Sequence, residues 1–165
     1  MKILPSPTAG LVCLIVGIAF ADTLAERPTL PRSDVAADMR RGYQASVRCI
    51  EGGRPATEWC RRFQLLRKPS SSASFLLGAN FGFSFNAETS AEGVGATQDE
   101  LRMVAMQATS CRLTFEAQKA NLRLTDADVI AMLGINLRQF AAWKARVETA
   151  DQDRSVVKGQ PGLDL

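Results

Sequence analysis

Two apolar stripes with helical spacing occupy residues 33–66. The first begins at Ser33 or Asp34, either of which can cap a helix, and consists of Val35, Met39, Tyr43, Val47 and Ile50. Gly52 and Gly53 interrupt the spacing, and Pro55 stands where a following helix would begin. The second stripe consists of Trp59, Cys60, Phe63 and Leu66. The pattern predicts an N-terminal αα-hairpin.

A different pattern follows the polar segment Lys68 to Ser72. Odd positions are apolar: Ala73, Phe75, Leu77, Ala79, Phe81, Phe83, Phe85 and Ala87. Leu76 aside, even positions are small or polar: Ser74, Gly78, Asn80, Gly82, Ser84, Asn86 and Glu88. Alternation with period two predicts one long amphipathic strand, and Glu88 to Ala96 is the nearby segment for a return strand in a β-hairpin.

This strand has three interpretations, because a single strand cannot satisfy its own backbone hydrogen bonds. The C-terminal helices cover its apolar face, or it pairs with copies of itself in a membrane-inserting sheet or barrel, or it captures an extended peptide at its edge. The expected interaction residues are Phe75, Leu77, Phe81, Phe83 and Phe85.

Helical spacing returns after residue 96. Thr97 and Glu100 have the spacing of a capping box, and the stripe behind them consists of Leu101, Val104, Ala108, Cys111 and Phe115. Thr125 opens a further helical region that contains Val129, Ile130, Leu133, Leu137, Phe140 and Val147. The expected fold is therefore α+β and mostly α-helical: an αα-hairpin, one long strand or β-hairpin, and two C-terminal helices.

The N-terminus has the pattern of a secretory signal peptide. Lys2 gives a positive start, Leu11 to Phe20 is an uncharged apolar run, and Ala19-Phe20-Ala21 places small residues two apart before Asp22. The apolar run is shorter than the roughly 20 residues that a transmembrane helix needs. We expect cleavage between Ala21 and Asp22 and a location in the periplasm or outside the cell. The expected organisation is a signal peptide over 1–21, an extended leader over 22–32, one globular domain over 33–150 and a flexible tail over 151–165.

Charge and cysteine content change this picture at two places. The net charge of the whole chain is +3, but basic residues gather in one part of the sequence, where they form either a solvated helical face or a patch for an acidic partner. The members of this predicted basic patch are Arg40, Arg41, Arg54, Arg61, Arg62 and Arg67. Cleavage removes Cys13 and leaves Cys49, Cys60 and Cys111, of which two can pair outside the cytoplasm. A Cys49–Cys60 bridge would staple the hairpin, and Cys111 is the alternative partner.

The chain contains no histidine. Catalytic arrangements that need an imidazole base, and zinc sites that need a histidine ligand, are therefore excluded. No phosphate-binding loop or nucleophile-elbow pattern is present. We expect a protein that is not an enzyme, with no cofactor and no metal.

One segment resembles the helix-turn-helix of small repressors. Asp128 to Ile135, with Gly134 at the turn, is followed by Phe140 and Trp143 at the spacing that holds two such helices. The resemblance covers about twenty residues and departs at Ile130, where these motifs have a small residue. It implies that Asn136, Arg138, Gln139 and Lys144 face DNA. The other interpretation is a bend within a helical core.

These observations favour a non-enzymatic binding or accessory protein of the cell envelope or of a secretion assembly. Its expected partner is another envelope protein or a second copy of the chain, with no nucleic acid. The first alternative is an oligomeric membrane-active protein that uses the Phe75–Ala87 strand. The second is DNA binding, which requires that the signal peptide is not real.

Overall fold

The computed structural model describes residues 32–51 and 55–158, and these residues form six α-helices. The signal peptide, its cleavage site at Ala21 and Asp22, and Arg54 lie outside the described residues. The helices are α1 (Arg32–Ile50), α2 (Ala56–Leu66), α3 (Ala73–Gly93), α4 (Gln98–Asn121), α5 (Asp126–Leu133) and α6 (Leu137–Lys158). No strand occurs among the described residues, so the predicted α+β class is wrong.

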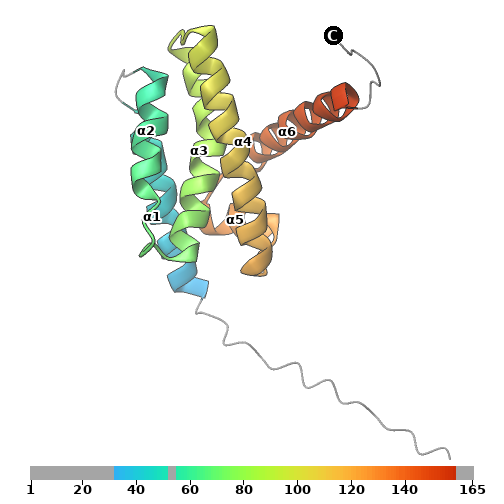
Figure 1. The fold of residues 1–165 in the computed structure, drawn as a ribbon. Helices are drawn as coiled ribbons and strands as arrows, with labels where there is room; N and C mark the ends of the chain where they lie inside the picture. Colours follow the sequence, from blue (N-terminus) through green and yellow to red (C-terminus); the bar gives the residue numbers. More distant parts are fainter. Residues whose placement is uncertain (1–31, 52–54, 159–165) are drawn as a thin grey trace, which may run out of the picture.

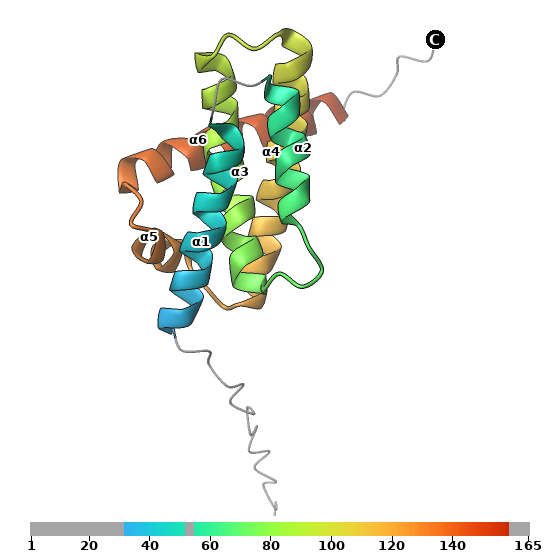
Figure 2. The ribbon, with the colours of Figure 1, turned by 90° about the vertical axis from the view of Figure 1, so that its left-hand side faces the viewer.

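Helices α1 to α4 form an antiparallel sequence of up, down, up and down (Figure 1). Helix α3 packs against α1 and α4, while α2 bridges α1 and α4 on the other side. Helix α6 crosses this bundle instead of running along it, and α5 lies at the foot of α1 (Figure 2). The predicted αα-hairpin is present as α1 and α2, and Pro55 stands at the N-cap of α2.

The segment predicted as a strand is helix α3. Four of its even positions, Ser74, Gly78, Gly82 and Asn86, lie at every fourth residue, and a row spaced by four is also one face of a helix. Small or polar residues at every fourth position fit both a strand, with period two, and one face of a helix. The apolar odd positions occupy the remaining faces of the helix. Ser72 caps the helix by accepting from the backbone N–H of Phe75 at 3.2 Å.

The phenylalanines of α3 point into two different cores. Residues two apart on a helix point about 200° apart, so Phe81 and Phe83 face opposite sides. The Phe83 ring lies 4.6 Å from that of Phe63 in a core formed by α1 to α4. The Phe81 ring lies 5.0 Å from that of Phe115 in a second core that includes α5 and α6. The expected interaction residues Phe75, Leu77, Phe81, Phe83 and Phe85 therefore belong to a central helix, and the membrane-active alternative loses the strand on which it depended.

Glycines allow α1 and α3 to approach closely. A Cβ added at Gly78 would lie 1.9 Å from the backbone oxygen of Met39, and one at Gly42 would lie 1.9 Å from that of Phe75. A Cβ at Gly82 would lie 2.1 Å from Ser46 Oγ. The row of Ser74, Gly78, Gly82 and Asn86 is therefore the face of α3 that contacts α1.

The C-terminal part contains three helices where two were expected. The predicted capping box of Thr97 and Glu100 is confirmed, and Thr125 forms a second capping box with Asp128. Gly134 then ends α5 with left-handed backbone angles, φ 66° and ψ 35°, which glycine adopts without strain. Helix α6 continues to Lys158, beyond the expected domain limit at residue 150.

None of the helices among the described residues is long and apolar enough to cross a membrane.

Candidate functional site

A cleft of about 190 Å³ opens where α6 crosses α3 and α4. We call it the α6 cleft. It is lined by Ser84, Phe85, Glu88, Thr89, Ala105, Ala108, Thr109, Arg112, Trp143, Arg146, Val147, Ala150 and Asp151. The cleft therefore combines an aromatic floor with a rim that carries charges of both signs.

Trp143 forms the floor and holds α6 against α3. Its side chain is buried, and its indole N–H donates to the backbone carbonyl of Ser84 at 3.1 Å. Its ring meets Phe81 edge to face at 5.3 Å and Phe85 at 6.0 Å between centroids. The hydrogen bond from this buried indole fixes the position of α6 along α3.

The outer end of the cleft is bridged by an ion pair between α4 and α6. Arg112 Nη2 lies 2.9 Å from Asp151 Oδ1. The Arg112 side chain is only 13 % exposed, whereas that of Asp151 is 48 % exposed. A guanidinium that is largely buried in this way can donate hydrogen bonds to a second carboxylate, or to a carbonyl, that enters the cleft.

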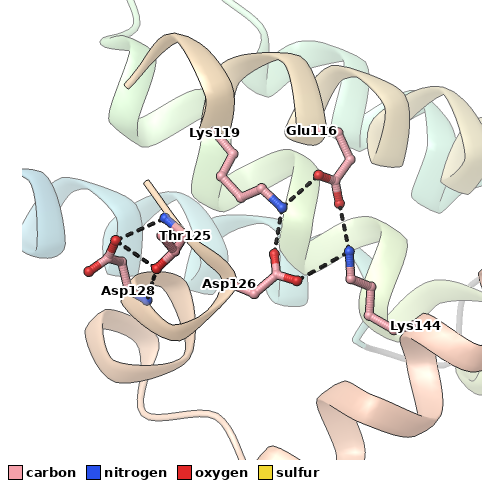
Figure 3. Close-up of polar contacts among 6 residues, drawn as sticks. All are labelled: Glu116, Lys119, Thr125, Asp126, Asp128 and Lys144. Carbon is pink, nitrogen blue, oxygen red and sulfur yellow. Dashed lines mark hydrogen bonds and ion pairs between the residues drawn. The ribbon is translucent and has the colours of Figure 1, made fainter. Parts of the chain in front are cut away.

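The first half of α6 is fixed at Lys144 by a closed ring of four charges (Figure 3). Lys119 on α4 contacts Glu116 and Asp126, the first residue of α5. Lys144 on α6 closes the ring, at 3.3 Å from Glu116 and 3.2 Å from Asp126. The ring joins α4, α5 and α6 at one point.

Hydrogen bonding in this ring keeps two of its members charged. Burial lowers the pKa of Lys119, but its hydrogen bonds to Asp126 and Glu116 outweigh burial and raise the pKa above its usual range. Burial likewise raises the pKa of Asp126, and the hydrogen bonds from Lys119 and Lys144 outweigh it, so that this pKa lies below its usual range. The ring is therefore a structural support for the α6 cleft at neutral pH.

The three predicted disulfide cysteines come together in one core. Cys49 on α1, Cys60 on α2 and Cys111 on α4 are all buried there, and all three are free thiols in this structure. Burial raises the pKa of each thiol, that of Cys111 to about 11. Such thiols are protonated and unreactive at neutral pH. The structure therefore brings the predicted residues together without a bridge.

The predicted basic residues do not act as one group. Arg41 pairs with Asp38, and Arg61 donates to Glu58 at 2.8 and 2.6 Å, each pair within a single helix. Arg40 donates to the backbone oxygen of Met132 at 3.0 Å and so ties α1 to α5. Arg62 and Arg67 lie in and just after α2. Three of these side chains thus have structural partners of their own.

The segment that resembles a helix-turn-helix forms two helices, α5 and α6, joined by a short turn at Gly134. Two of the four side chains implied to face DNA have other partners, since Lys144 belongs to the charge ring. Asn136 caps α6 by accepting from the backbone N–H of Arg138 at 2.9 Å and of Gln139 at 3.3 Å. The side chains of Arg138 and Gln139 are exposed.

The sequence named Phe85 as an interaction residue, but it did not predict the α6 cleft or its charged rim. Arg112 and Asp151 are separated by 39 positions, and no local pattern connects them. Trp143 appeared only as part of the helix-turn-helix spacing. Among the described residues, no group of three or more histidine, cysteine, aspartate or glutamate side chains could hold a metal ion.

A scan of protein-family models, a search of curated proteins and a search of solved structures each found no match to this chain. The α6 cleft and the sequence itself therefore carry the functional argument.

Proposed function

We propose that this chain is exported and works outside the cytoplasm as a non-enzymatic binding protein. Its partner is a segment of another envelope protein that enters the α6 cleft. The observation that carries the proposal is the lining of the cleft, in which Phe85 and Trp143 form an apolar floor and Arg112, Arg146, Glu88 and Asp151 surround it. A peptide segment offers the matching chemistry, because it carries apolar side chains beside backbone carbonyls and charged groups.

The N-terminal sequence pattern supports the export step of this proposal. The positive start at Lys2, the apolar run and the Ala19-Phe20-Ala21 end are the pattern of a cleaved signal. N-terminal sequencing of the protein from a fractionated native host tests this step. We expect a start at Asp22 in the periplasm or medium, and an intact Met1 in the cytosol would overturn it.

Site-specific photocrosslinking in the native host tests the binding step. Ala150 lines the α6 cleft and is exposed, whereas Ala142 is also exposed on α6 but does not line it. With p-benzoylphenylalanine at position 150 we expect one adduct of defined mass, and none with the same group at position 142. Arg146→Glu should weaken that adduct, while Arg138→Glu outside the cleft should leave it unchanged. Equal adducts at both positions would contradict the proposal.

The α5–α6 turn supports a second candidate, DNA binding by a chain that stays in the cytosol. Gly134 gives the tight turn of a helix-turn-helix, and Arg138 and Gln139 are exposed at the start of α6. Fluorescence anisotropy with a labelled random-sequence duplex tests it. Binding that falls with salt and is lost in Arg138→Ala, together with an intact Met1 in the cytosol, would favour this candidate.

A further inference from the structure

Helix α4 carries a second row of residues on the face that points away from the bundle. Its core side includes Val104 and Cys111, which are buried. Positions two apart on a helix lie about 200° apart, so residue 106 faces away from residue 104. The outward row is uncharged and is spaced alternately by three and four positions, and we call it the α4 seam. Its members are Met103, Met106, Ser110, Leu113, Ala117 and Ala120.

The α4 seam is exposed along its whole length. Met106 is 69 % and Leu113 57 % exposed, and the other members are exposed as well. Neighbouring helices flank the seam: α2 meets α4 at Gln107, which accepts a hydrogen bond from Gln64 at 2.6 Å, and α6 meets α4 at Arg112. The seam shares no residue with the lining of the α6 cleft. Large apolar side chains grouped on one exposed face mark an interaction surface.

The spacing of the α4 seam indicates a helix as the partner. Residues that alternate by three and four positions occupy the a and d positions of a coiled coil, where each side chain packs between four residues of the facing helix. From Met103 to Ala120 the seam is about 26 Å long. A second copy of α4 offers the same length and the same spacing. The seam is therefore complementary to itself.

The charges beside the α4 seam favour an antiparallel pair of such helices. In a parallel pair, Asp99, which continues the row at its N-terminal end, would face Asp99 of the second copy, and like charges repel. In an antiparallel pair with its two-fold axis beside Thr109, Arg102 of each copy faces Glu116 of the other. The Arg102 side chain is largely exposed, and that of Glu116 is partly exposed beside its lysine partners. This arrangement brings opposite charges together.

We propose that two copies of this chain associate through the α4 seam as an antiparallel dimer with two-fold symmetry. Pairing of the same surface on both subunits is the commonest arrangement in homo-oligomers. A seam one helix wide and about 26 Å long buries less than roughly 1,200 Å² in total, which is the low end for specific interfaces. The dimer should therefore dissociate in the micromolar range.

Sedimentation velocity of the full protein over a series of micromolar concentrations tests the association. We expect the sedimentation coefficient to rise with concentration from that of a monomer to that of a dimer. Leu113→Glu places a charge in the seam and should weaken association roughly tenfold or more. Leu65→Glu is the matched control, because Leu65 is 61 % exposed on α2, outside the seam, and it should leave association unchanged.

Circular dichroism checks that both variants are folded. A protein that stays monomeric at every concentration would overturn the proposal and would leave the seam to a different protein. Equal weakening by Leu113→Glu and Leu65→Glu would also overturn it, because association would then not depend on the seam.

Crosslinking with a short bismaleimide tests the orientation. Ser110 lies one position from the proposed axis, so two thiols introduced there come close together in an antiparallel pair. Ala120 lies eleven positions from the axis, which separates its two copies by about 33 Å. In a parallel pair both positions would face their own copies. The wild type is the control, since Cys49, Cys60 and Cys111 are at most 7 % exposed.

We expect a covalent dimer from Ser110→Cys and none from Ala120→Cys or the wild type. Adding Leu113→Glu to Ser110→Cys should remove most of the covalent dimer, whereas adding Leu65→Glu should not. Crosslinking of Ala120→Cys at the same yield as Ser110→Cys, or of neither variant, would overturn the antiparallel dimer.

Discussion

Cys111 makes the stability of the protein sensitive to alkaline pH. Burial raises its pKa to about 11 in the folded protein, whereas an unfolded thiol titrates near ~8.5. The folded state therefore binds the proton more tightly. The contribution of Cys111 to stability is fully present below pH ~8.5 and is lost as pH rises through about 11. The total contribution is ~3 kcal/mol. Cys49 and Cys60 shift in the same direction.

Urea unfolding between pH 7.5 and 10.5 measures this loss. Cys111→Ala should show a weaker decline of the unfolding free energy with pH than the wild type, although it costs packing at every pH. Val104→Ala truncates another buried side chain of the same core and should keep the full decline. A decline that is equal in all three proteins would assign the alkaline sensitivity to other groups.

Asp126 has the opposite pH dependence, because its pKa is lowered by hydrogen bonds from Lys119 and Lys144. Its contribution is present above the usual carboxyl pKa of ~3.9 and is lost as pH falls through the lower folded value. Since its side chain is 37 % exposed, solvent screens the interaction, and we expect Asp126→Asn to cost about 1 kcal/mol at pH 7.

The cost of Asp126→Asn should shrink toward zero below pH 3, as measured by thermal unfolding across an acid series. Asp99→Asn is the control, because Asp99 is 95 % exposed and lies 3.9 Å from Arg102. We expect no measurable effect of Asp99→Asn at any pH. An Asp126→Asn cost that stays constant from pH 7 to pH 2 would contradict the charge ring as its cause.

At the scale of elements, the close approach of α1 and α3 depends on Gly78. A Cβ there would lie 1.9 Å from the Met39 carbonyl oxygen, and backbone cannot move aside as a flexible side chain can. Gly78→Ala should therefore lower the unfolding free energy by about 3 kcal/mol or more. Gly93→Ala in the same helix meets nothing within 4 Å and should be neutral or stabilising by up to ~1 kcal/mol. Chemical denaturation of the two variants gives the comparison, and equal effects would contradict the close packing.

The same glycines explain why the sequence misled at α3. Local signals placed α2 and α4 well, since Pro55 and Thr97 with Glu100 mark helix starts where the structure has them. In α3, the strand prediction placed Gly78 and Gly82 on the polar face of the strand. Glycine is, however, equally suited to a face that contacts another helix. Only the presence of α1 alongside decides between the two, and that contact is not local in the sequence.

The α6 cleft was beyond prediction for a related reason. Its parts come from α3, α4 and α6, and the angle of α6 depends on Gly134 and on the charge ring. The motif spacing indicated the turn at Gly134, but Lys144 counted there as a side chain facing DNA and not as a partner of Glu116 and Asp126. A site made by helices that cross leaves no periodic pattern in any one of them.

At the scale of the whole molecule, α3 belongs to both cores and should make them unfold together. Phe83 lies in the core that holds the three cysteines, and Phe81 lies in the core beneath α6. Any movement of α3 therefore opens both at once, which favours a single cooperative transition.

The buried thiols report on that transition. In the reduced protein, Cys49, Cys60 and Cys111 are each at most 7 % exposed and come from three different helices. We expect pulse labelling with a maleimide in increasing urea to modify all three at the same midpoint, and this midpoint should coincide with the loss of helical circular dichroism. Because α2 is only 11 residues long, it is, of the three helices that carry these cysteines, the one most able to open by itself. Labelling of Cys60 at lower urea than Cys49 and Cys111 would show that α2 detaches first, and the bundle would then consist of two cooperative units.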